Sequence, residues 1–302
     1  MLTIDRIERP EAAEFREKYL RKGKPVVIRE NRDDSPAQMA WDFDTLAATA
    51  GDCDIPVYDW GSKGPTVDDD FLIGRMTLRQ AIEHAREVER PSQQRYSVCQ
   101  LALEFLPPLA RAYQTPKFLE GIEQAGRRPP SLFREPRRQA LFLSFFRGMH
   151  WHNGREVVAQ LVCGRKRFVL FSPKDSRFLY PRRFVESPRA WFDETEAVFC
   201  SEIPFENGIE NIDLERFPLF RHAKPIVIDL GPGDLLYIPT HWWHYTHALE
   251  PCVLVADFWD APMDLWAFPL AWRTVIMKPY RKYLYRRLLG AGYLTRRVKS
   301  AA

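Results

Sequence analysis

Short apolar runs, separated by turns that contain Gly or Pro, fill the chain from about residue 140 to residue 260. Each run has the length of a strand and is too short for a typical core helix. Several such strands in series predict a closed or sandwiched β architecture. The twenty Phe, eleven Tyr and nine Trp of the chain suit such a β-rich core. The expected strands are 141–146, 156–163, 166–172, 224–230, 234–239 and 252–259.

Helical patterns lie on both sides of this β region. Residues 10–22 predict a helix, because Pro10 is tolerated in a first turn and Gly23 ends the pattern. Further elements of the N-terminal part are expected to be helices near 38–49 and over 77–88, strands at 25–28 and 94–99, and a loop at 61–70 that is rich in Asp, Gly and Pro.

We expect the 302 residues to form one domain of mainly β structure with flanking helices. Its parts are an N-terminal helical and strand segment (1–135), a β core (136–262) and basic C-terminal helices (263–302). The five cysteines are widely spaced, with no CxxC pair, which disfavours a disulfide framework. Neither a signal peptide nor a transmembrane run is apparent, so we expect a cytoplasmic protein.

The positive charge of the chain is concentrated at its C-terminal end. From Arg273 onward there are nine Lys or Arg residues and no acid, which leaves 35 basic against 40 acidic residues elsewhere. Specific nucleic-acid binding by the body of the chain is therefore not expected. Aromatic and aliphatic residues lie among these charges, and a homodimer formed through C-terminal helices is one expected use of them.

Three histidines are spaced as metal ligands. His150 and His152 flank Trp151 just after an expected strand, and in an extended chain residues i and i+2 point to the same face. His244 follows in the run GPGDLLYIPTHWWH. Imidazoles with a carboxylate suit Fe, Mn, Ni, Cu or Zn, so a metal site made by these histidines is predicted, with Glu156 as a possible fourth ligand.

These segments resemble the two-part motif of the cupins, in which His-x-His and a Glu are followed later by a Gly–Pro–His segment. The second part here consists of Gly233, Pro239 and His244, and His241 stands where cupins usually have Gly. The chain also resembles the JmjC-type, or cupin-like, hydroxylases in three runs: GRKRFVLFSP (164–173), PGDLLYIPTHWWH (232–244) and VADFW (255–259). The resemblance implies a double-stranded β-helix (jelly-roll) core.

The resemblance further implies an Fe(II)- and 2-oxoglutarate-dependent oxygenase that hydroxylates a protein or peptide side chain. Lys166 shares a strand face with apolar residues, and an inward ammonium group needs an anionic partner. The corresponding Lys of the family holds 2-oxoglutarate. We also assign Arg147, Asp257 and Ser97 to the candidate cosubstrate-binding residues.

Three residues and the length of one segment depart from the hydroxylase pattern. His152 replaces the carboxylate of the usual HxD or HxE, while Glu156 and Asp257 stand where the family often has Asn, close to the inner carboxylate of 2-oxoglutarate. In addition, one extra residue lies between His150 and Gly164.

These departures leave two other functions open. One is a cupin oxygenase that works without 2-oxoglutarate, with Glu156 completing a three-His-one-Glu site. The other is a non-catalytic metal-binding scaffold. The metal is Fe(II) in the first hypothesis, although other divalent ions fit. The substrate is a protein, a peptide or a small molecule.

Overall fold

The computed structural model describes residues 3–29, 40–59, 72–87, 95–144, 147–152, 154–181, 200–205 and 208–267, together with 271, 272 and 275. Nearly all of the basic C-terminal segment, and with it the predicted dimerisation helices, lies outside these residues. Within them, no helix is both long enough and apolar enough to cross a bilayer.

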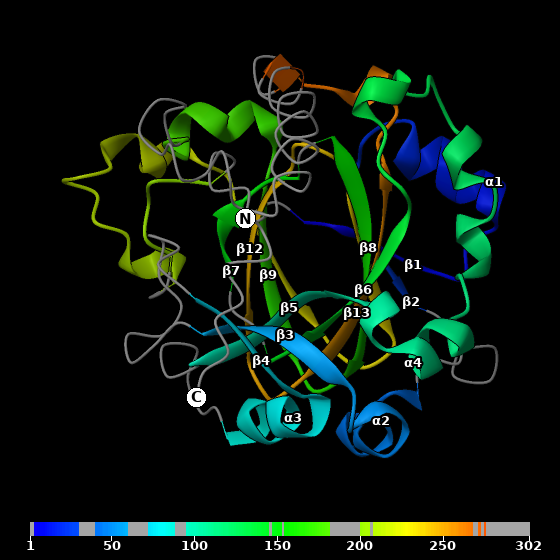
Figure 1. Ribbon diagram of the computed structural model, residues 1–302. Coiled ribbons are helices and arrows are strands. Elements are labelled where there is room, and N and C mark those ends of the chain that lie inside the picture. Colours follow the sequence, from blue (N-terminus) through cyan, green and yellow to red (C-terminus); the bar gives the residue numbers. More distant parts are fainter. Residues whose placement is uncertain are drawn as a thin grey trace.

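Two β-sheets form the centre of the molecule (Figure 1). The smaller has the order β10-β9-β12-β7, and the larger has the order β1-β2-β11-β8-β13-β6-β5-β3-β4. Its inner four strands, β11-β8-β13-β6, together with the smaller sheet make the eight-stranded double-stranded β-helix that the sequence predicted. The core strands are β6 (Arg138–Leu143), β7 (Arg147–His150), β8 (Arg155–Cys163), β9 (Lys166–Phe171), β10 (Ile226–Leu230), β11 (Asp234–Ile238), β12 (Trp243–Ala248) and β13 (Val253–Asp260).

The N-terminal segment extends the larger sheet at both edges. On one side β2 (Val26–Arg29) pairs with β11 and β1 (Asp5–Glu8) pairs with β2. On the other side β5 (Tyr96–Ala102) pairs with β6, followed by β3 (Asp54–Asp59) and β4 (Leu72–Thr77). The helices are α1 (Ala12–Phe15), which continues as a π-helical turn (Arg16–Leu20), α2 (Phe43–Ala50), α3 (Leu78–Glu87) and α4 (Pro107–Ala112).

These helices cover the outer face of the larger sheet. Phe15 of α1 is fully buried and meets Phe118 and Tyr237 edge to face, with ring centroids 5.1 Å away in both cases. Buried residues of α2 and α3, such as Leu46 and Ile82, pack in one cluster with β5, β6 and β13. Figure 1 shows α1 on one flank of the barrel and α2 and α3 below it.

The largest difference from the sequence prediction concerns the expected strand 141–146. A single strand was expected over 141–146, but β6 ends at Leu143 and β7 begins at Arg147 in the other sheet. The chain therefore crosses from one sheet to the other just before the first candidate ligand. Strands β1, β3, β4 and β12 were not predicted; β3 and β4 flank the expected 61–70 loop as an antiparallel pair.

A β-bulge interrupts the pairing of β8 with β13. Val253 pairs with Cys163 whereas Leu254 pairs with Leu161, so Val162 is the extra residue at this point. A bulge places one additional residue in a strand. The sequence carries one residue more than the hydroxylase pattern between His150 and Gly164, and the bulge lies inside that interval.

Replacing Phe15 with Ala should lower the free energy of unfolding by about 3–5 kcal/mol, because it opens a cavity between α1 and the sheet. Phe105, which is 46% exposed, provides the matched control, and Phe105→Ala should change stability by about 0.5 kcal/mol or less. Chemical denaturation of both variants measures the difference. Equal losses would contradict the packing described here.

Candidate metal centre

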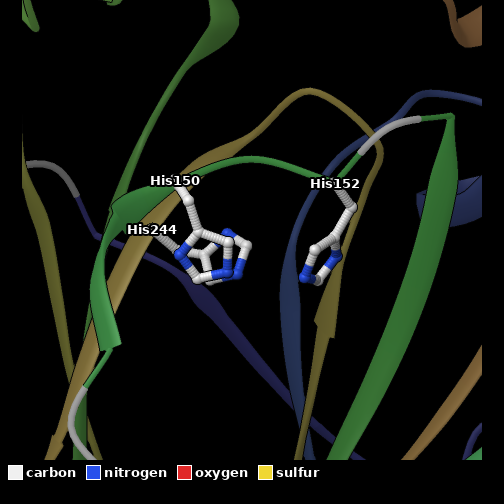
Figure 2. Close-up of side chains that lie close together, drawn as sticks. All are labelled: His150, His152 and His244. Carbon is white, nitrogen blue, oxygen red and sulfur yellow. The ribbon is translucent and has the colours of Figure 1, made fainter. Parts of the chain in front are cut away.

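Three histidines from two neighbouring strands converge inside the barrel. His150 ends β7, His152 follows two residues later, and His244 lies opposite His150 in the antiparallel pairing of β12 with β7. Figure 2 shows their rings pointing toward one another. One nitrogen from each ring lies within 4.8 Å of the other two, and all three side chains are buried. The cluster fits a metal site.

Backbone carbonyl groups orient two of these rings. Nδ1 of His150 lies 2.7 Å from the carbonyl oxygen of Gly148, and Nδ1 of His244 lies 3.0 Å from that of Trp242. A ring that donates its Nδ1–H to a carbonyl keeps its Nε2 lone pair available as a ligand. The same arrangement fixes the tautomer and the direction of both rings toward the shared point.

The segment that delivers His244 is tied to four distant parts of the chain. The Thr240 hydroxyl donates to the carbonyl of His152 at 3.4 Å. Trp242 donates from Nε1 to the carbonyl of Gly23, and Trp243 donates from Nε1 to Oγ of Ser176. His241 accepts the N–H of Ala267. These hydrogen bonds of residues 240–243 hold the neighbouring His244 in a fixed position relative to the rest of the fold.

The histidines open into an elongated cavity between the two sheets. About 460 Å³ of space lies between the lining atoms, and this volume includes open solvent at the mouth. Lys166 at the start of β9 lines the same cavity, although it is only 1% exposed. Burial lowers the pKa of its ammonium group. The remaining lining is Cys99, Phe142, Val157, Ala159, Phe168, Ile238, Thr246, Leu254, Ala256 and Phe258.

Glu156 does not join the histidines. The side chains of Val157 and Ala159 on β8 face the cavity, and successive residues of a strand face opposite ways, so Glu156 points to the outer face. There its Oε1 accepts the Tyr237 hydroxyl at 2.6 Å and its Oε2 accepts Nε1–H of Trp259 at 2.9 Å. The expectation of a fourth ligand from Glu156 is corrected accordingly.

Asp257 also lies on the outer face, since its neighbours Ala256 and Phe258 line the cavity. Arg137 donates to both carboxylate oxygens, at 2.8 and 2.5 Å, and the Tyr113 hydroxyl donates at 3.0 Å. This buried ion pair uses the carboxylate that the sequence had assigned to the cosubstrate. The cosubstrate assignment of Asp257 is therefore corrected.

The structure does not place the side chains of the other two cosubstrate candidates, Ser97 and Arg147, in the cavity. Ser97 on β5 is buried but is not among the described residues that line the cavity, whereas Cys99, two residues further on, is. The backbone of Arg147 belongs to β7, and its side chain lies outside the described part of the structure.

A model of the family described as "Cupin-like domain" matches residues 12–265. The chain belongs to the cupin-like domain family. The match covers both the N-terminal segment and the β core, in agreement with the mainly β fold. It ends at residue 265, before the run of basic residues that begins at Arg273.

Several curated proteins resemble this cupin-like chain. HSPB1-associated protein 1 of Bos taurus is 38% identical over 98 residues, which are 32% of this chain and 18% of that protein. Lysine-specific demethylase 8 of Danio rerio is 27% identical over 269 residues, covering 85% of this chain and 58% of the relative. The tRNA wybutosine-synthesizing protein 5 of Homo sapiens is 25% identical over 271 residues, covering 85% and 78%. The chain thus spans less than a fifth of the first of these relatives.

The sequence prediction missed one polar residue of the cupin-like cavity. Thr246 lies two residues after His244 on β12 and is buried. Its hydroxyl oxygen has no hydrogen-bond partner among the described residues. A buried hydroxyl without a partner is costly, so Thr246 is suited to contact a polar group of a bound molecule. Trp151 and Trp243 are fully buried and belong to one cluster with Met149 and Tyr245.

The position of Glu156 leads to a pH dependence of stability. Burial raises the pKa of its carboxyl group to about 8, even though the hydrogen bonds from Tyr237 and Trp259 oppose that shift. The folded state therefore retains a proton that the unfolded chain releases near pH 4.5. Because of this difference, the free energy of unfolding should fall as pH rises from about 5 to 8, with a limiting slope of ~1.4 kcal/mol per pH unit.

Glu156→Gln should remove this slope, because the amide mimics the protonated carboxyl group. Chemical denaturation of the metal-free protein at several pH values measures it, and the exposed Glu104 supplies the matched control Glu104→Gln, which should keep the wild-type slope. An unchanged slope in Glu156→Gln would contradict the assignment.

Proposed function

We propose that this cupin-like chain is an Fe(II)- and 2-oxoglutarate-dependent oxygenase that hydroxylates a protein or peptide side chain. The observation that carries the proposal is the placement of a fully buried Lys166 in the same apolar cavity as the three histidines. The cavity combines a metal-binding end with a cationic group, and the rest of its lining excludes water.

The charges of the cavity select the class of ligand. None of the described residues that line it is acidic, and the two nearby carboxyl groups of Glu156 and Asp257 are held on the opposite face of the sheet. A divalent ion held by the histidines and the ammonium group of Lys166 would both attract a negatively charged ligand. A dicarboxylate would match both of these positive groups, and no acidic residue of the described lining would repel it.

The donor set is compatible with iron. Neutral imidazoles bind Fe(II) as well as Zn, Cu and Ni, and iron bound there would supply oxygen activation coupled to oxidation of the oxoacid. The protein's own contribution is to hold the three rings, to bind the far carboxylate through Lys166 and the Thr246 hydroxyl, and to keep the cavity dry. His152 stands where the family usually has a carboxylate, and its ring would supply the second nitrogen ligand.

The alternatives receive less support. An oxygenase without 2-oxoglutarate was suggested by Glu156 as a ligand, and that carboxylate lies on the outer face with both oxygens bonded. A non-catalytic scaffold leaves unexplained why Lys166 and the three histidines line one and the same cavity. The names of the relatives refer to lysine in one case and to a tRNA in another, so the choice of a protein or peptide substrate comes from the resemblance of the sequence motifs.

Anaerobic titration of the Fe(II)-loaded protein with 2-oxoglutarate tests the proposal. The wild type should develop the visible charge-transfer band of the chelate. Lys166→Met should weaken 2-oxoglutarate binding about 30-fold or more, because a buried charged partner contributes at least ~2 kcal/mol. The exposed Lys174 supplies the control Lys174→Met, which should titrate like the wild type. A protein that binds Fe(II) and develops no band would refute 2-oxoglutarate dependence.

A further inference from the structure

His241 occupies a strained backbone position next to the metal centre. Its φ is +62°, in the left-handed region that favours glycine, and the side chain is completely buried. Strain of this kind persists where the surroundings hold a residue firmly, and it is concentrated at functional sites. The cupin motif has Gly at this position, so the imidazole has been introduced at an energetic cost.

The imidazole of His241 contacts two separate parts of the structure. Its ring lies against Trp151, with centroids 4.9 Å apart, and Trp151 is the fully buried residue between the first two metal-binding histidines. Nδ1 of His241 accepts the backbone N–H of Ala267 at 3.2 Å. The ring thus lies between the metal-binding segment of the chain and the segment that follows the last core strand.

The two ligand-bearing segments meet at this ring. His241 is three residues before His244, and Trp151 is bonded directly to both His150 and His152 in the chain. The neighbouring hydroxyl of Thr240 donates to the His152 carbonyl. The distance between the two segments determines whether three nitrogens reach one ion, and the contact between His241 and Trp151 sets that distance from the side away from the cavity.

We propose that His241 is a positioning residue of the metal centre, which fixes the spacing of the three ligands through Trp151 and links it to docking of the segment around Ala267. This inference rests on the metal site of the proposed function. It assigns His241 no ligand role, because its ring faces Trp151 and the Ala267 backbone.

The test compares Co(II) binding by the wild type, His241→Gly and His241→Asn. Both replacements tolerate the left-handed backbone, and Asn keeps a hydrogen-bond acceptor while it removes the ring. We expect the Co(II) dissociation constant to rise about 10-fold or more in both, as for other residues that orient ligands, together with a changed visible absorption of the bound ion. The exposed His222 provides the control His222→Asn, which should match the wild type.

Thermal unfolding of the metal-free proteins separates positioning from simple stabilisation. His241→Gly loses the packing of a buried ring and gains relief of the backbone strain, so its unfolding curve gives the unfolded fraction against which the loss of Co(II) affinity is compared. The inference would be overturned if His241→Gly bound Co(II) with wild-type affinity and spectrum. It would also be overturned if the loss of affinity were no larger than the fraction of unfolded protein accounts for. If the wild type itself bound no Co(II), the metal site would fail and this inference with it, whereas equal binding by all variants overturns the inference alone.

Discussion

The antiparallel pairing of His244 with His150 is the contact on which the site depends. β12 lies between β7 and β9, so its register determines both which residue faces the first ligand and which residues share the cavity with Lys166. A shift of one residue in a strand sends every side chain to the other face. With the observed register, His244 and Thr246 both face inward, and the ligands from the two segments converge on one point.

The larger sheet separates the buried acidic side chains of Glu156 and Asp257 from Lys166. The acids of β8 and β13 are on its outer face, where Glu156 is held by Tyr237 and Trp259 and Asp257 by Arg137. The ammonium group of Lys166 is on the other side, in the cavity with the histidines. Among the described residues that line the cavity there is therefore one ammonium group and no acid. The carboxylate of Asp257 would repel a dicarboxylate if it stood on the inner face.

The clustering of the three histidines could be predicted from one short-range rule and one motif. Residues i and i+2 share a face, which brings His150 and His152 together, and the PGDLLYIPTHWWH run placed His244 by resemblance. Recognising 243–248 as a strand would have placed Thr246 beside His244 by the same rule, but the mixture of His, Tyr, Thr and Trp hid the strand. The break between β6 and β7 was hidden because the run 141–146 contains neither Gly nor Pro, and its one turn-favouring residue is Ser144, whose φ is +34°.

Which side chains of β8 and β13 point into the barrel could not be predicted from the sequence. EVVAQLVC and CVLVADFW are apolar on both faces, because helices cover one side and the barrel interior fills the other, so no alternation shows which residues point inward. Assigning Glu156 and Asp257 by motif position therefore put them on the wrong face, one residue away from Val157 and from Ala256. In a strand that is buried on both faces, the sequence pattern does not reveal an error of one residue in the assigned face. Here that error placed two acidic residues in a cavity whose described lining contains none.

A crystal structure of the Fe(II)-loaded protein, with anomalous diffraction recorded at the iron edge, tests the central claim most directly. The account predicts one anomalous peak about 2.0–2.2 Å from a nitrogen of each of His150, His152 and His244, with Glu156 still bonded to Tyr237 and Trp259. A peak coordinated by the Glu156 carboxylate, or no peak between the three imidazoles, would contradict it.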